Sequence, residues 1–207
     1  MTDATATVEK FLDAAASKTP APGGGSVAAL AGALAAAMAE MTINYSIGKK
    51  GLEAHQAELT VANHELQNAR KMLQQLLLED QLAFEALRAV KKLPDGPDKQ
   101  TALNAAVIAC VRVPEAIGAT AARILEIADA NVHKVNVYLL SDLAVCAELA
   151  MATVRCAVYN VRANMPEVKD PADQKSIEAT MSHILSRAAI LIQRVVPRIW
   201  ARHAQGA

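Results

Sequence analysis

A long helical pattern between residues 53 and 93 most constrains how this chain can fold. Leucines recur there seven residues apart, at Leu59, Leu66 and Leu73, and further apolar residues continue the stripe as far as Leu87. Side chains at this spacing lie on one face of an α-helix. The pattern therefore predicts one long helix, straight or bent, whose apolar face other helices must cover.

Helical patterns also fill most of the remaining sequence. Apolar spacing, together with the Gly and Pro residues that interrupt it, predicts helices over residues 8–16, 26–47, 101–130 and 141–164, and a last one from after Pro171 to near Arg202. Pro114 should either kink the helix that contains it or divide that helix in two. We see no alternating strand pattern, so the sequence predicts five to seven helices in a single domain over residues 1–207.

The composition indicates how these helices pack. Aromatic residues make up only 3% of a chain that is 53% hydrophobic, so close approach of alanine-rich helices should fill the core in place of large rings. We therefore expect an all-α, antiparallel helical bundle. A bundle this apolar and this short of aromatics should also hide helix faces at a subunit interface, which predicts a homodimer.

Charge and hydropathy argue against several classes of partner. The chain has 21 Lys and Arg residues and 21 Asp and Glu residues, so no overall field favours nucleic acid. The longest apolar run, residues 27–39, is shorter than the roughly 20 residues that cross a bilayer, and we expect no transmembrane helix. The N-terminus lacks the pattern of an export signal, which predicts a cytoplasmic location.

The cysteines and histidines predict neither a disulfide framework nor a metal site. Cys110, Cys146 and Cys156 are odd in number, lie within apolar helical patterns and form no Cys-x-x-Cys pair, so we interpret them as core residues. The five histidines show no spacing typical of metal ligands. We expect no bound metal.

The segment between the first two predicted helices has the composition of a binding loop. It reads PAPGGGS over residues 20–26 and leads into an alanine-rich helix. Prolines fix the approach of the chain, glycines let the backbone come close to a ligand, and Ser26 can cap a helix start that favours an anion. The run matches a dinucleotide-binding pattern literally, but no strand precedes it and no lysine closes it as in a phosphate loop. A plain helix-start turn is the alternative.

Two aspartates lie on apolar helix faces, where an unpaired carboxylate is costly. Asp80 lies in the core stripe of the long helix, and Asp142 aligns with Val145 at the start of a later helix. Either carboxylate could carry chemistry. For Asp80 the alternatives are a buried ion pair or a position at the edge of the apolar stripe. For Asp142 the alternative is a helix-dipole role beside an N-capping Ser141.

Five segments of the chain match one protein family in the same order. They are PAPGGGSVAAL at residues 20–30, DQLAF at 80–84, KLP at 92–94, VPE at 113–115, and SDLAV at 141–145, which leads to Asn160. With these segments the chain resembles the cyclodeaminase and methenyltetrahydrofolate cyclohydrolase family over most of its length. The resemblance implies an all-helical, dimeric protein that handles one-carbon units on tetrahydrofolate, alone or as the C-terminal half of a formiminotransferase-cyclodeaminase.

The resemblance also implies a reaction. No transferase half precedes this domain in the sequence, so we expect a stand-alone cyclohydrolase that converts 5,10-methenyltetrahydrofolate to 10-formyltetrahydrofolate. A stand-alone formiminotetrahydrofolate cyclodeaminase that releases ammonia and a non-catalytic folate-binding helical module are the alternatives. The tetrahydrofolate derivative would be the substrate, with no further cofactor and no nucleic-acid or membrane partner.

Chemistry and resemblance together assign candidate site residues. The catalytic candidates are Asp142 and Asp80, which could orient or deprotonate water, and Lys49, which could donate to the developing oxygen or to the folate. The substrate-binding candidates come from the loop and from three other positions: Pro22, Gly23, Gly24, Gly25, Ser26, Leu93, Pro94 and Ser141.

Overall fold

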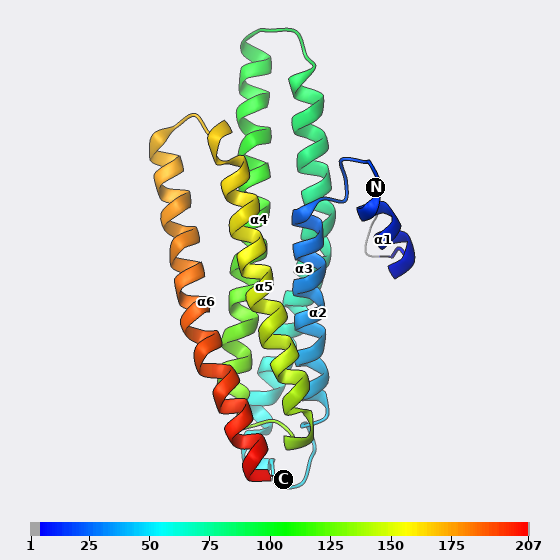
Figure 1. Cartoon of the computed structure of the whole chain (residues 1–207), viewed down its shortest axis with the longest axis vertical. Helices are drawn as coiled ribbons and strands as arrows, with labels where there is room; N and C mark the ends of the chain where they lie inside the picture. Colours follow the sequence, from blue (N-terminus) through cyan, green and yellow to red (C-terminus); the bar gives the residue numbers. More distant parts are fainter. Residues whose placement is uncertain (1–4, 207) are drawn as a thin grey trace.

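The protein is an elongated helical bundle (Figure 1), seen here in a computed structural model that describes residues 5–206. Six α-helices and three short 3-10 helices, but no strand, occur within these residues. In chain order they are α1 Val8–Ala16, α2 Gly24–Asn44, η1 Glu53–His55, α3 Gln56–Lys91, α4 Pro97–Asn131, η2 Val137–Leu139, α5 Leu140–Asn164, η3 Met165–Glu167 and α6 Pro171–Gly206. The all-α prediction with five to seven helices is confirmed.

Four helices surround the core and a fifth covers one side of it. The helices α2, α3, α4 and α5 each pack against the next, α5 packs against α2, and α6 packs against α4 and α5. Helix α1 lies beside the others (Figure 1), and of its apolar residues only Phe11 is buried, whereas Val8 and Leu12 are 76% and 59% exposed.

Small residues let the helices approach closely, as the composition predicts. Helix α2 buries six alanines, and its Gly32 lies so near two helices that an added Cβ would stand 3.1 Å from side-chain atoms of Leu73 and of Thr153. A Cβ on Gly118 of α4 would stand 3.0 Å from the Cβ of Ala157 on α5. These contacts fix how α2 and α4 sit against their neighbours.

The structure corrects several expectations about helix bounds and burial. Helix α2 begins at Gly24 and not at Ser26. Of the two alternatives for Pro114, division of the helix does not occur, because α4 continues through this buried proline as one helix. The last helix continues to Gly206. Cys110 and Cys146 are buried as expected, but Cys156 is exposed, so the interpretation of Cys156 as a core residue is wrong.

Three helical segments are long and apolar enough to raise the question of a membrane span. By length and composition alone, α2, α4 and the segment Val137–Glu167 could each cross a membrane. About half or more of each apolar window is buried inside the bundle, where it meets other helices. The expectation of no membrane span therefore stays a prediction, and the remaining apolar surface needs a separate explanation.

The contact between Gly118 and Ala157 yields a stability prediction. Gly118→Val should lower the free energy of unfolding by about 1–3 kcal/mol, because its side chain must displace a neighbour that is anchored to the backbone. Ala119→Val, one residue along α4 at an exposed position, should change it by less than about 0.5 kcal/mol. Urea titration followed by circular dichroism measures both, and equal effects would contradict this account of the packing.

Candidate active site

The glycine-rich loop leads directly into the first turn of α2. Gly23 occupies the N-cap position and has no side chain to accept a hydrogen bond from the helix start. Ser26, expected as the cap, lies inside the helix in its first turn, so that expectation is wrong. Its hydroxyl instead donates to the Oδ2 atom of Asp80 at 2.8 Å and to the Leu77 carbonyl at 3.3 Å.

Asp80 of α3 takes over the capping role for α2. Its carboxyl accepts a hydrogen bond from the Ser26 backbone N–H as well as from the Ser26 hydroxyl. A capping side chain normally accepts from the second or third residue of its own helix, and Ser26 is the third residue of α2. A carboxylate from a neighbouring helix therefore meets the positive end of the α2 dipole.

Gly25 makes this contact possible. A Cβ added to Gly25 would stand 2.0 Å from the Oδ1 atom of Asp80 and 2.5 Å from its Cγ. No side chain fits at that distance, so residue 25 must be glycine while Asp80 keeps its position. The sequence shows a glycine run, but only the structure shows which of the three glycines the carboxylate requires.

The surroundings of Asp80 favour its protonated form more than water does. Burial raises the pKa of Asp80 above its ordinary value, against the opposing effect of the two hydrogen bonds from Ser26. Among residues 5–206, no lysine, arginine or histidine forms an ion pair with it. A partly buried carboxylate without a cation is available to a charged ligand or to a proton.

A cavity of 180 Å³ opens beside this carboxylate. The loop, α3, α4 and α5 all contribute to its wall, which consists of Pro20, Ala21, Gly23, Gly24, Gly25, Asp80, Gln81, Phe84, Cys110, Asn160, Ala163 and Asn164. Burial, with a smaller contribution from the charge of Asp80, raises the pKa of the Cys110 thiol to about 11. Cys110 therefore stays a thiol at neutral pH and is not a thiolate nucleophile.

Sequence reasoning did not assign a role to the asparagines of this cavity. Asn160 lies so close to the loop that a Cβ on Gly24 would stand 3.1 Å from its Oδ1 atom. Asn164 Nδ2 donates to the carbonyls of Cys110 and Asn160, at 3.0 Å each. Two asparagines four residues apart on an apolar helix are the signal that could have indicated this wall.

The other candidate residues lie far from Asp80 within the same chain. Ser141 and Asp142 belong to the first turn of α5, whereas the cavity meets that helix near Asn160. Eighteen residues separate Asp142 from Asn160, or about 27 Å along a helix. Lys49, whose Nζ lies 5.5 Å from the centre of the Tyr138 ring, belongs to the same distant end of the bundle.

Leu93 and Pro94 lie at a third position. They connect α3 to α4 at the tip of the hairpin that projects beyond the other helices (Figure 1). Leu93 is half exposed. One protomer therefore brings together Asp80 and residues 22–26, but not Lys49, Leu93, Pro94, Ser141 or Asp142.

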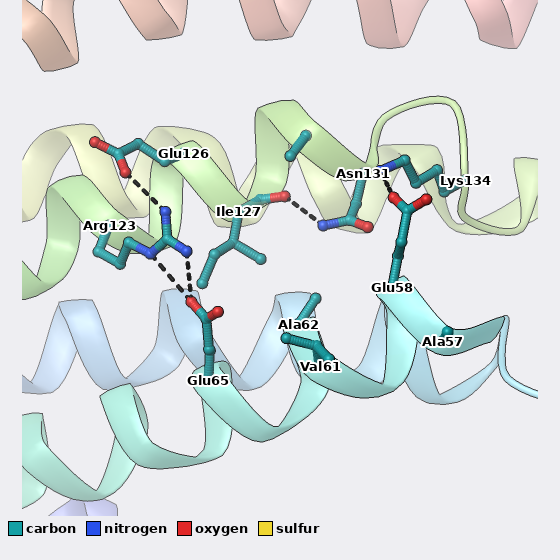
Figure 2. A pocket seen from close by; sticks show the side chains of 11 residues that line it. Ala57, Glu58, Val61, Ala62, Glu65, Arg123, Glu126, Ile127, Asn131 and Lys134 are labelled. Carbon is teal, nitrogen blue, oxygen red and sulfur yellow. Dashed lines mark hydrogen bonds and ion pairs between the residues drawn. The ribbon is translucent and has the colours of Figure 1, made fainter. Parts of the chain in front are cut away.

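A larger cavity, of 370 Å³, lies between α3 and α4 and has a different character. Figure 2 shows its charged side chains joined to one another: Arg123 binds Glu65 and Glu126, and Lys134 binds Glu58. Every carboxylate there already has a cation. Within the described part of the chain, no group of three or more His, Cys, Asp or Glu side chains could hold a metal ion.

Comparison with known proteins identifies relatives that match nearly the whole chain. A methenyltetrahydrofolate cyclohydrolase from Methylorubrum extorquens is 31% identical over 194 residues, which is 91% of this chain and 93% of that protein. The formimidoyltransferase-cyclodeaminase of Sus scrofa is also 31% identical, over 94% of this chain but only 37% of its own length. The chain thus spans little more than a third of the length of that protein.

A solved structure has the same fold. Formiminotetrahydrofolate cyclodeaminase from Thermotoga maritima superposes with a TM-score of 0.89 at 26% sequence identity, and the match covers 95% of this chain and 97% of that one. The family model described as formiminotransferase-cyclodeaminase matches residues 7–183. These residues include the loop, Asp80, Asp142 and Asn160, and the chain belongs to the formiminotransferase-cyclodeaminase family.

Proposed function

We propose that this protein is a methenyltetrahydrofolate cyclohydrolase, which hydrolyses 5,10-methenyltetrahydrofolate to 10-formyltetrahydrofolate. The observation that carries the proposal is the unpaired carboxylate of Asp80, held against a glycine-rich loop in a chain that matches a cyclohydrolase over nearly its full length. The whole domain would serve this one activity. The same site could run the reaction in the reverse direction.

The reaction needs a group that handles both a cation and a proton. Water attacks the cationic amidinium carbon of the substrate and loses a proton, and the ring opens when the nitrogen at position 5 leaves with a proton. Asp80 would attract the cation and then orient the water or accept its proton. General base catalysis of this kind contributes about 10²- to 10⁴-fold in rate.

The loop would hold the substrate beside that carboxylate. The backbone of Pro22, Gly23, Gly24, Gly25 and Ser26 lies along the cavity or next to it, so its polar groups can bind a carbonyl or anionic edge of the folate. Asn160, on the opposite wall, adds an amide close to Gly24. Roles for Leu93, Pro94, Ser141, Lys49 and Asp142 remain proposals that rest on the family resemblance.

Cyclodeaminase activity is the second candidate, and one observation favours it. The structure from Thermotoga maritima is described as a cyclodeaminase although 97% of its chain matches this one. Relatives that match over nearly their whole length thus include one named as a cyclohydrolase and one named as a cyclodeaminase. The length of the sequence therefore does not decide between the two activities. Both reactions would use the same carboxylate beside the same loop.

We also infer the setting in which the enzyme works. The protein would be a homodimer in the cytoplasm, with no metal ion and no further cofactor. The balanced charge of the chain agrees with the absence of a nucleic-acid or membrane partner, and the folate would be the only ligand that the reaction needs. The apolar outer face of α2 supports the dimer.

A spectroscopic assay tests the proposed function directly. Purified protein should accelerate the loss of near-ultraviolet absorbance from 5,10-methenyltetrahydrofolate. With formiminotetrahydrofolate, the competing cyclodeaminase reading predicts release of ammonia and appearance of the same chromophore. Acceleration of the cyclodeaminase reaction alone would show that the protein is a cyclodeaminase and not a cyclohydrolase. If the protein accelerates neither reaction, only a non-catalytic folate-binding module is left.

Asp80→Asn should lower kcat by about 10²- to 10⁴-fold, because the amide keeps the shape of the side chain but cannot accept a proton. The Ser26 hydrogen bonds can persist with the amide oxygen, so far-ultraviolet circular dichroism should not change. Glu85→Gln, an exposed carboxylate on the same helix, is the matched control and should leave kcat unaltered. Comparable activity of Asp80→Asn and the wild type would exclude Asp80 as the base.

The raised pKa of Asp80 also predicts how stability depends on pH. A carboxyl whose pKa is raised on folding favours the native state below its unfolded pKa and loses that contribution as the pH rises through the folded pKa. At neutral pH, Asp80→Asn should therefore have a melting temperature equal to or above that of the wild type. The difference should shrink as the pH falls and Asp80 becomes neutral, and a difference that grows in acid would contradict the pKa direction.

Gly25→Ala should abolish most of the activity, because the new Cβ would displace the Asp80 carboxyl from which it would stand 2.0 Å away. Gly96→Ala, where an added Cβ meets nothing within 4 Å, is the control and should keep full activity. Combining Gly25→Ala with Asp80→Asn should cost little more than either change alone, since both remove the same group. Additive losses in kcat would show that Gly25 acts through something other than Asp80.

A further inference from the structure

The cavity between the start of α3 and the end of α4 contains a buried polar atom that has no partner. Asn131 is 4% exposed, and its Nδ2 atom donates to the Ile127 carbonyl at 2.8 Å. That hydrogen bond fixes which end of the amide is the oxygen. Among the residues that the structure describes, no group donates to the Asn131 Oδ1 atom. A buried oxygen without a hydrogen bond is costly, so it favours a ligand that donates one.

The rest of the cavity wall suits a small molecule. Figure 2 shows the Asn131 amide between the Arg123 end and the Lys134 end of the cavity, with its oxygen turned toward Glu58. The volume of 370 Å³ lies within the roughly 300–1,000 Å³ of small-molecule sites, which are mostly apolar and orient their ligand with a few polar atoms. The uncharged side chains of the wall, apart from Asn131, are all apolar: Ala57, Val61, Ala62, Ile127 and Ala130.

The charged side chains around this cavity already neutralise one another. Three carboxylates meet three cations, in the pairs Glu58–Lys134, Glu65–Arg123, Glu126–Arg123 and Glu126–Arg187. A ligand with a net charge would have to break one of these pairs or lie beside a like charge, and both are costly away from water. The cavity therefore favours a neutral molecule.

We propose that this cavity binds a neutral small molecule with an apolar body and one hydrogen-bond donor, as in a phenol or an indole. The donor gives its hydrogen to Asn131 Oδ1, and the body lies against Val61, Ala62 and Ile127. Ala62 and Asp80 are eighteen residues apart on α3, or about 27 Å along the helix, so this site is separate from the cavity beside Asp80. The inference does not depend on the cyclohydrolase proposal.

An ion pair at one end of the cavity can part to admit the ligand. Glu58 and Lys134 join α3 to α4, and their side chains are 57% and 25% exposed. Exposed ion pairs contribute little to stability, so separating these two side chains costs little. The helix itself stays in place, because Leu59 and Leu66 of α3 are fully buried in the core.

The cavity between α4 and α6 lacks this combination of features. Its volume is 530 Å³, but its Asp129 carboxylate already binds Arg194 and Arg198. Among residues 5–206, no buried side-chain atom in its wall is without a hydrogen bond. Asn63 of α3 does have a buried oxygen without a partner, but it does not line the cavity between α3 and α4. Asn63 is therefore a matched control for Asn131.

Binding of phenol and toluene to the purified full-length chain tests the site. The two probes have nearly the same shape, but only phenol has a donor. We expect phenol to bind more tightly and to shift the backbone amide signals around Ala62 and Ala130 in two-dimensional NMR. Tighter binding of toluene, or signals that shift only elsewhere in the chain, would overturn the proposal. If neither probe changes the spectrum, water alone satisfies Asn131 Oδ1 and the proposal fails.

Asn131→Leu removes the acceptor and nearly keeps the size of the side chain. It should lower the affinity for phenol relative to toluene by about 5- to 100-fold, because the phenol hydroxyl then has no partner in the cavity. Comparing the two probes cancels the effect of the substitution on the apolar wall. Asn63→Leu should leave the ratio of affinities unchanged. The same ratio in Asn131→Leu as in the wild type would show that this oxygen takes no part in binding.

A second variant tests the cavity should Asn131→Leu fail to fold. Ala130 lines the cavity at an exposed helix position, so Ala130→Leu fills the space without entering the core and should abolish binding of both probes. Ala119→Leu, at an exposed position of α4 outside this cavity, should bind both probes as the wild type does. Unchanged binding in Ala130→Leu would contradict the location of the site.

Charged probes test the chemical class of the ligand. Benzylamine and benzoate should each bind at least about tenfold more weakly than phenol, because the ion pairs leave no charge for either to neutralise. Tighter binding of either one would overturn the proposal of a neutral ligand. None of these measurements uses the enzymatic reaction, so their outcome is independent of whether the protein is a cyclohydrolase.

Discussion

The close approach of the Asp80 carboxyl to the backbone of α2 is the constraint on which the candidate site depends. The carboxyl caps a helix that has only glycine at its own N-cap, and it can do so because residue 25 has no side chain. The same contact partly buries the carboxyl and raises its pKa. The start of α2, the register of α3 and the chemistry of the site are therefore set by one interaction.

Most of the fold follows from the sequence because helical periodicity is a local signal. The leucine stripe of α3 and the proline breaks before α4 and α6 indicated the helices and their number. The start of α2 was misplaced by two residues because Ser26 is a good capping residue by type, and the residue that performs the capping lies 54 positions away. Val8 and Leu12 follow the pattern of a buried face and yet are exposed, since periodicity shows which side chains share a face but not whether anything covers it.

The site was predictable only in part, for a related reason. Periodicity places Asp80 and Asp142 on apolar helix faces, and family resemblance selects both, but neither gives the distance between them. That distance follows from where along each helix the residues lie and how the helices are staggered. Asp80 lies beside the loop because α3 passes the start of α2. Asp142 lies in the first turn of α5, and the part of α5 that lies beside the loop is near Asn160, at the other end of that helix.

The missing counter-ion of Asp80 has a consequence for turnover. Among residues 5–206 of its own protomer, no cationic side chain forms an ion pair with this carboxylate, so in the proposed reaction the amidinium of the substrate is its partner. Hydrolysis converts that cation into a neutral formamide, and the attraction disappears with the charge. The carboxylate of Asp80 therefore attracts the cationic substrate more strongly than the neutral product. The loss of the substrate's charge during the reaction thereby favours release of the product.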